Sequence, residues 1–296
     1  QMPQIFVNIA YQRMTADGFN FLIDRGLFPE FYFCGDTIDN IERQTINDIK
    51  SLVTTQNFAS TLHAPFYDLN IGARDRSIRI ASFERLLWAV ETAAMLGSKI
   101  VVIHPGYGSG DVDIEPWLDR AGSIIKKLLE YASERNIRLA FENIYDNRPD
   151  YLVKLLQFAG SPDAGICFDV GHFNIFSQVP MQAWLDALGP HIFECHLHDN
   201  DKSGDQHRAI GDGNVDCYLR AIVDAVKARK EVLGESLPDQ NPLVTATHVT
   251  VADDDLKTLL SNPPIKAKVG TARPAFTAHP KDPRPDPKTP VFTGVF

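Results

Sequence analysis

The sequence of 296 residues lacks several features that mark particular classes of protein. Its four cysteines form no C-x-x-C pair, which argues against a structural zinc knuckle and favours small core residues in a reduced compartment. No apolar run approaches the roughly 20 residues that a membrane span needs, and no basic segment followed by an apolar one opens the chain. We therefore expect a soluble, cytoplasmic protein without a membrane partner.

An excess of positive charge is also missing. The net charge is −9, so the bulk composition gives no general reason to expect a nucleic-acid partner, although a local basic groove remains compatible with it. No G-x-G-x-x-G turn follows the first strand-like run, as a dinucleotide-binding fold would require.

Strand-like and helix-like patterns alternate along most of the chain. Eight β-branched or aromatic runs are predicted as strands, at 4–9, 31–34, 59–63, 99–104, 138–143, 165–169, 192–197 and 243–247. Apolar residues recur at helical spacing at 78–96, 116–135, 151–159, 181–188, 218–233 and 253–260. This alternation predicts an α/β fold, namely a (β/α)8 TIM barrel.

The barrel is predicted to be a single domain over residues 1–261. Residues 262–296 are rich in proline and show neither helical nor strand periodicity. Because proline removes backbone donors and cannot sustain a helix, we expect a Pro-rich, irregular and disordered C-terminal tail.

Five of the predicted strands end in a residue that can bind a metal ion. These residues are His63, His104, Glu142, Asp169 and His196. The C-terminal ends of barrel strands meet at one rim, where a TIM barrel carries its active site. Carboxylates buried there without a cation would cost several kcal/mol each. Together the five residues predict a divalent-metal centre, because imidazole and carboxylate suit Zn²⁺, Mn²⁺ or Fe²⁺.

Three further candidates follow these strands. His172 comes three residues after Asp169, and Asp205 and His207 share one side of an extended loop. Each residue taken alone has an ordinary structural explanation. Glu142 could pair with Arg148, for example, and His198 could be a surface loop residue.

Six short motifs carry a family resemblance: HAPF at 63–66, HPG at 104–106, FEN at 141–143, FDVGH at 168–172, HLHDND at 196–201 and DQHRAIGDG at 205–213. With them the chain resembles the xylose isomerase-like TIM-barrel superfamily. That superfamily holds the sugar phosphate isomerases/epimerases and the endonuclease IV-like apurinic endonucleases (AP endonuclease family 2).

The resemblance implies specific roles. Glu142, Asp169 and His196 would be shared metal ligands. In an endonuclease, a three-zinc cluster would be completed by His63, His104, His172, Asp205 and His207. In a single-metal isomerase the same positions line the substrate pocket. One departure stands out, since the last strand usually ends in a metal-binding Glu and here holds Ala246 or Thr247, with His248, Asp253 or Asp254 as candidate replacements.

Three functional hypotheses follow. The first is an isomerase or epimerase of a sugar, sugar phosphate or related hydroxy-ketone, working through an enediolate stabilised by Mn²⁺, Zn²⁺, Co²⁺ or Mg²⁺. Glu142 would serve as ligand and proton shuttle, with His172 and His207 orienting substrate hydroxyls. The alternative is a zinc phosphodiesterase acting on abasic DNA, and only this alternative involves nucleic acid. The third is a metal-binding barrel with decayed activity. The number of bound ions distinguishes the three.

Overall fold

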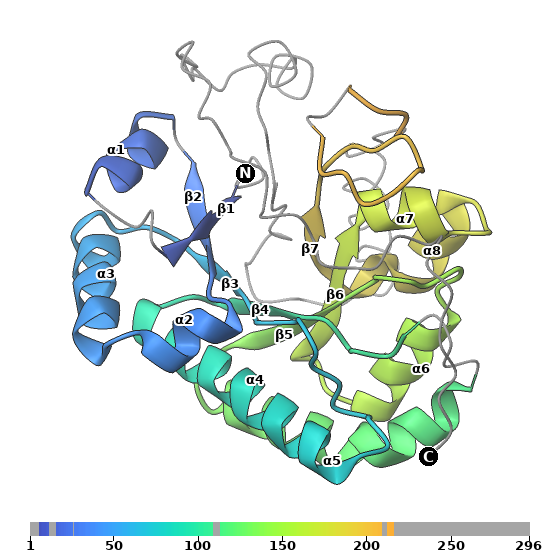
Figure 1. The fold of residues 1–296 in the computed structure, drawn as a ribbon. Helices are drawn as coiled ribbons and strands as arrows, with labels where there is room; N and C mark the ends of the chain where they lie inside the picture. Colours follow the sequence, from blue (N-terminus) through green and yellow to red (C-terminus); the bar gives the residue numbers. More distant parts are fainter. Residues whose placement is uncertain (1–5, 12–15, 26, 109–112, 209–211, 216–296) are drawn as a thin grey trace, which may run out of the picture.

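Seven parallel strands form one curled sheet in a computed structural model that describes residues 6–11, 16–25, 27–108, 113–208 and 212–215 (Figure 1). The strands are β1 (Phe6–Ala10), β2 (Phe28–Tyr32), β3 (Thr61–His63), β4 (Ile100–Ile103), β5 (Arg138–Glu142), β6 (Ala164–Asp169) and β7 (Ile192–His196). Their spatial order follows their order in the sequence. This is the sheet of a TIM barrel, as predicted. The predicted strand 243–247, the predicted helices 218–233 and 253–260 and the proline-rich tail lie outside the described residues.

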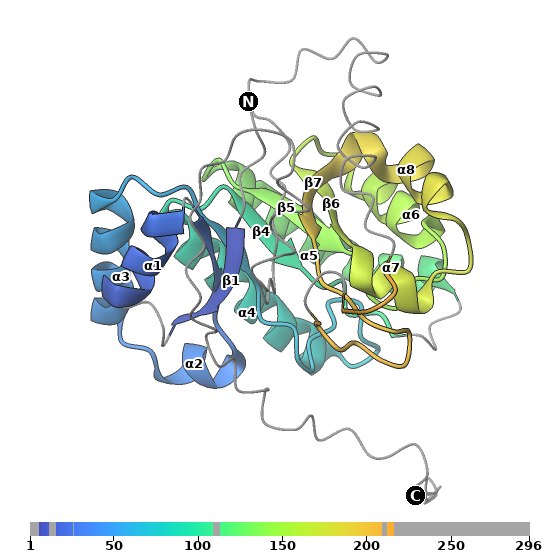
Figure 2. The ribbon, with the colours of Figure 1, turned by 90° about the horizontal axis from the view of Figure 1, so that it is seen from above.

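Helices cover the outer side of the sheet, and Figure 2 shows them arranged around the curl. They are α1 (Ala16–Arg25), α2 (Gly35–Asn40), α3 (Arg43–Thr55), α4 (Arg76–Leu96), α5 (Ile114–Ser133), α6 (Asp150–Ala159), α7 (Val170–Phe176) and α8 (Met181–Leu188), followed by the 3₁₀ turn η2 (Gly189–His191). The helices predicted at 78–96, 116–135, 151–159 and 181–188 correspond to α4, α5, α6 and α8. None of the described helices is long and apolar enough to cross a bilayer.

Alternation along the strands gives the sheet two different faces. On β5, Leu139 and Phe141 point outward into the large core formed with the helices. Ala140, between them, joins Val102 and Cys167 in a small apolar cluster inside the curl. Both faces are buried, which explains why these strands read as continuous apolar runs.

A bulge between β6 and β7 sets which residues of β7 face inward. The register shifts at Ile166 and Cys167, so that Cys167 pairs with Glu194 and Asp169 with His196. The extra residue, Phe193, lies against Gly165, where a Cβ atom would come within 2.4 Å of its ring. The bulge thus places Glu194 and His196 on the inner face.

One predicted strand is displaced. The sequence predicted 31–34, whereas β2 begins at Phe28. Pro29 and Glu30 interrupt the apolar run on which the prediction relied, yet backbone pairing with β1 and β3 holds them in the strand. The correction matters because it brings Glu30 into the barrel.

Candidate metal centre

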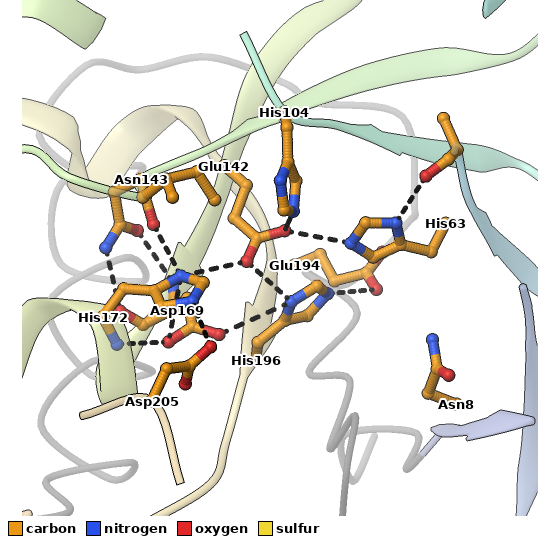
Figure 3. Close-up of polar contacts among 12 residues, drawn as sticks. Asn8, His63, His104, Glu142, Asn143, Asp169, His172, Glu194, His196 and Asp205 are labelled. Atoms are coloured by element: carbon orange, nitrogen blue, oxygen red, sulfur yellow. Dashed lines mark hydrogen bonds and ion pairs between the residues drawn. The ribbon is translucent and has the colours of Figure 1, made fainter. Parts of the chain in front are cut away.

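Glu142 lies at the centre of the donor groups at the barrel mouth, at the end of β5 (Figure 3). Its Oε2 atom is 3.2 Å from Nε2 of His63 and 3.2 Å from Nε2 of His104. Its Oε1 atom is 3.3 Å from Nδ1 of His172 and 3.3 Å from Nδ1 of His196. The side chain is buried, so four imidazoles from different parts of the chain converge on a single carboxylate.

A second group of donors surrounds Asp169, at the end of β6. Its Oδ2 atom is 3.7 Å from Nδ1 of His196, and both of its carboxylate oxygens are 3.1 Å from Nε2 of His198. Asp169 also begins α7, because its Oδ1 atom accepts the backbone N–H of His172 at 2.6 Å. This capping bond places His172 over the mouth.

The third group lies in the loop after β7. Oδ2 of Asp205 is 3.4 Å from Nε2 of His172 and 3.0 Å from Nε2 of His207. His207 adopts a left-handed backbone conformation with φ 47° and stacks on His198 at 4.0 Å between ring centroids. All eight residues predicted as ligands therefore belong to one continuous network.

Backbone carbonyls fix two of the rings. Nδ1 of His63 donates to the carbonyl oxygen of Ala64 at 2.8 Å, and Nδ1 of His172 donates to that of Asn143 at 3.0 Å. Because a carbonyl can only accept, Nδ1 carries the proton in each neutral ring and Nε2 presents a lone pair. Nε2 of His63 is thus directed toward Glu142, and Nε2 of His172 toward Asp205.

Asn143 connects the ends of β5 and β6. Its amide nitrogen donates to the carbonyl oxygen of Asp169 at 2.9 Å, and its amide oxygen accepts the backbone N–H of Asp169 at 2.8 Å. Such bonds hold a ligand in place from behind and are typical supports of metal sites. Asn143 lies in the FEN motif, but no role was predicted for it.

The electrostatics suit a cation. Burial lowers the pKa of His104 to about 4, so this imidazole is neutral at pH 7. Burial would raise the pKa of Glu142, but the charge on His196 and the hydrogen bonds from His104 and His172 lower it well below its ordinary value. Burial likewise opposes the charging of His172, but Asp169, Asp205 and Glu142 raise its pKa well above its ordinary value. The centre therefore holds ionised carboxylates that attract positive charge.

The donors fit a metal ion. In each of three sets of residues, the ligand atoms lie within 4.8 Å of one another. The sets are His63–Glu142–His196, Asp169–His172–His198 and His198–Asp205–His207. Tetrahedral zinc, with bonds of about 2.0–2.2 Å, separates its ligands by about 3.3–3.6 Å. The contacts of Glu142 with His63, His104 and His196, at 3.2–3.3 Å, are close to that spacing.

His198 was not among the predicted ligands, and the surface loop position suggested for it is wrong. It is 1% exposed and contacts Asp169. Gly171 makes room for it, since a Cβ atom there would lie 2.0 Å from the His198 ring. The second histidine of HLHDND was the feature of the sequence from which this donor could have been predicted.

An aromatic wall borders the centre beside β3. Phe66 stacks on His104 with ring centroids 4.4 Å apart, and Tyr32 meets His63 edge-on. Tyr67, adjacent in sequence, is 57% exposed. The mouth thus offers a flat apolar surface next to its ligands.

Two arginines near the mouth form ion pairs with acidic side chains. Arg208, one of the basic candidates near the mouth, forms an ion pair with Asp201 at 2.7 Å. Arg148 pairs with Asp150 at 3.1 Å rather than with Glu142. These arginines are therefore partly neutralised.

The parallel curled sheet and the donor groups at its strand ends place this protein among the TIM-barrel proteins whose strands end in histidines and carboxylates. The family model for the xylose isomerase-like TIM barrel matches residues 16–233, and the chain belongs to this family.

Two kinds of curated relative match the sequence. The uncharacterized protein MJ1311 of Methanocaldococcus jannaschii is 30% identical over 185 residues, covering 58% of this chain and 60% of that protein. The probable endonuclease 4 of Mycobacterium leprae (strain Br4923) is 27% identical over 178 residues, covering 56% of this chain and 68% of that protein. The alignments to MJ1311 and to a second M. jannaschii protein, MJ1614, span only 60% and 65% of those relatives.

Solved structures share the fold. The TTHB071 protein of Thermus thermophilus, soaked with ZnCl2, superposes with a TM-score of 0.69 at 23% identity, over 87% of this chain and 97% of its own. A D-tagatose 3-epimerase-like protein gives a TM-score of 0.65 at 22% identity, over 87% of this chain and 94% of its own. At this level of identity the likeness concerns the barrel architecture.

Proposed function

We propose that this protein is a metal-dependent hydrolase of phosphate esters that uses more than one divalent ion, with phosphodiesters as its substrate class. The observation that carries this proposal is the convergence of eight predicted ligands and His198 into three adjacent donor groups. A single-ion isomerase needs only the group formed by Glu142, Asp169 and His196. In such an isomerase the remaining positions line the substrate pocket, whereas here Asp205 lies 3.4 Å from His172 and 3.0 Å from His207, a spacing that suits ligands of a further ion. We therefore rank the phosphodiesterase hypothesis above the isomerase hypothesis, the reverse of their order in the sequence analysis.

The residues present would hold such ions in a defined way. His63 and His104 face one oxygen of Glu142 and His196 faces the other, so these four residues would hold ions on both sides of the carboxylate. Asp205, His172 and His207 supply the third position. Divalent ions there activate water and neutralise charge on a phosphate ester. The curated relatives that are named probable endonuclease 4 support this reading.

The chain's own residues preorganise that chemistry. Ala64 and Asn143 lock the tautomers of His63 and His172. Phe66, stacked on His104, shields one side of the centre from water. Ligands fixed before substrate arrives lose little free energy to reorganisation.

The first experiment is a nicking assay. Duplex DNA with one abasic site and an intact duplex are incubated with protein that has been stripped with EDTA and reloaded with Zn²⁺ or Mn²⁺. We expect metal-dependent cleavage, and we expect Asp205→Asn to abolish it while Asp201→Asn does not. Unchanged cleavage by Asp205→Asn would contradict the proposal.

The isomerase remains the second candidate because of the rim. Paired arginines and exposed acidic residues suit a small sugar better than a DNA backbone, whose binding depends on unopposed Lys and Arg. This candidate predicts metal-dependent deuterium incorporation into a ketose in D₂O that survives in Asp205→Asn. Absence of exchange with Mn²⁺, Co²⁺ or Mg²⁺ would eliminate it.

A further inference from the structure

Two carboxylates lie inside the barrel beneath the metal centre. Glu30, on β2, and Glu194, on β7, are both 0% exposed. Glu194 precedes His196 by two residues, and Glu30 pairs in register with Thr61, two residues before His63. Two residues of strand correspond to roughly 6–7 Å, so this pair forms a layer below the mouth.

The hydrogen bonds of this layer are incomplete. Oε1 of Glu30 accepts the side-chain amide of Asn8 at 2.9 Å. Within the described part of the chain, Oε2 of Glu30, both oxygens of Glu194, Oγ1 of Thr61 and Nε2 of His196 are buried without a hydrogen-bond partner. Buried polar atoms normally have partners, so this concentration of unsatisfied donors and acceptors calls for a ligand.

No side-chain cation from Lys or Arg fills this role among the described residues, because none lies within 4.0 Å of either carboxylate. Arg138 lies over the Phe193 ring at 4.3 Å; burial lowers its pKa, and the charges of Asp163 and Glu194 partly oppose that shift, but Arg138 forms no ion pair with Glu194. Two buried carboxylates that share the charge of a single imidazole, His196, remain undercompensated.

The spacing is that of ligands rather than of hydrogen bonds. Nε2 of His196 is 3.6 Å from Oε2 of Glu30 and 3.6 Å from Oε1 of Glu194. A distance of 3.6 Å between these atoms is too long for a hydrogen bond. Two ligands about 2.1 Å from a common ion, at an angle near 120°, lie about 3.6 Å apart. The three ligand atoms are all within 4.8 Å of one another.

We propose that Glu30, Glu194 and Nε2 of His196 form a second, interior site for a divalent transition-metal ion. Two carboxylate oxygens and one imidazole nitrogen suit Zn²⁺ or Mn²⁺. Thr61, beside Glu30 in the sheet, offers a further oxygen.

His196 connects this interior site to the centre at the mouth. Its Nδ1 atom faces Glu142 at 3.3 Å while Nε2 faces the interior pair. When ions occupy both sides, the remaining ring proton is released to solvent and the imidazole bridges the two sites. We assign this ion a structural role, since its carboxylate ligands are fully buried and lie one layer below the groups at the mouth.

Metal content tests this site. Wild type, Glu30→Gln, Glu194→Gln and the surface control Glu115→Gln are stripped, reloaded with Zn²⁺, freed of excess ion and measured by elemental analysis. We expect the two interior variants each to hold one ion fewer than wild type, and the control to match wild type. Wild-type metal content in both interior variants would overturn the proposal.

A second measurement does not depend on the folding of variants. Crystals of the wild-type protein loaded with Zn²⁺ are measured on both sides of the zinc absorption edge. An anomalous peak between Glu30 and Glu194 supports the interior site, and its absence overturns it.

The interior site is separable from the proposed function. If wild type cleaves no phosphate ester while Glu194→Gln still lacks one ion, the proposed function fails and the interior site stands. If cleavage depends on Glu142 but the interior variants keep every ion, the interior site fails and the proposed function stands.

Discussion

The two faces of one sheet follow different rules in this protein. On β5, Phe141 points outward into the helical core, and its neighbour Glu142 points inward among four imidazoles. The outer face buries apolar area, which stabilises the fold. The inner face concentrates charge, which opposes folding unless ions or protons compensate it. Stability and chemistry are therefore assigned to alternate residues of the same strands.

Replacing Glu142 by Gln should have the largest effect on chemistry. The variant keeps the shape of the side chain but removes the charge shared by His63, His104 and His196. We expect metal affinity and turnover to fall by more than about 100-fold. The melting temperature in EDTA should also fall, because the ionised Glu142 is stabilised by the surrounding imidazoles and its loss leaves them buried without a partner. Elemental analysis measures the metal content of the variant, and thermal denaturation measures its melting temperature. A full metal complement would contradict the assignment of metal binding to the inner face.

Replacing Phe141 by Ala tests the other face, one residue away. Phe141 is 1% exposed and lies in the outer core, so the cavity should cost about 3–5 kcal/mol of unfolding free energy. Urea denaturation measures this loss. Metal content per folded chain should stay at the wild-type value, and a loss of ions would show that the faces are coupled.

Replacing Asn143 by Ala should weaken metal binding without removing a ligand. Its two hydrogen bonds to the backbone of Asp169 hold that residue in place. We expect affinity to fall about 10- to 100-fold, as for other supporting residues of metal sites. Competition with a chelator of known affinity measures the change. Asn47→Ala, on the exposed side of α3, is the matched control and should bind as wild type does.

Asp146 provides the smallest and most specific effect, because it is a buried acid outside the three donor groups. Burial raises its pKa to about 6, although Tyr107 donates to it and partly opposes the shift. The folded state therefore holds a proton that the unfolded state releases at lower pH. Stability should fall by about 1 kcal/mol as pH rises from 5 to 7.

Asp146→Asn should remove that part of the pH dependence, since Asn can still accept from Tyr107. Urea denaturation of both proteins in EDTA at pH 5 and pH 7 gives the comparison. Parallel pH profiles for the two proteins would show that Asp146 ionises normally.

The outer face was the easier one to predict. Continuous apolar runs such as Ile100–Ile103 and the helical periodicity of 78–96 depend on local sequence, and they located β4 and α4 within a few residues. Strand ends were equally informative, because the parallel topology brings them to one rim whatever the loops do.

The inner face below the rim could not be predicted in the same way. Glu30 follows a proline in a short strand, and Glu194 faces inward only because of the bulge at Ile166 and Cys167. His198 is buried because Gly171 leaves space for its ring. These placements depend on register and on contacts between distant residues, which the local pattern does not contain.

The proposed chemistry at the barrel mouth depends on ions binding between the strand ends. Anomalous diffraction from the zinc-loaded protein tests it most directly, because it locates each ion relative to named atoms. We predict peaks within bonding distance of Glu142, Asp169 and Nδ1 of His196. Zinc bound only elsewhere on the molecule, with no peak among these three residues, would contradict it.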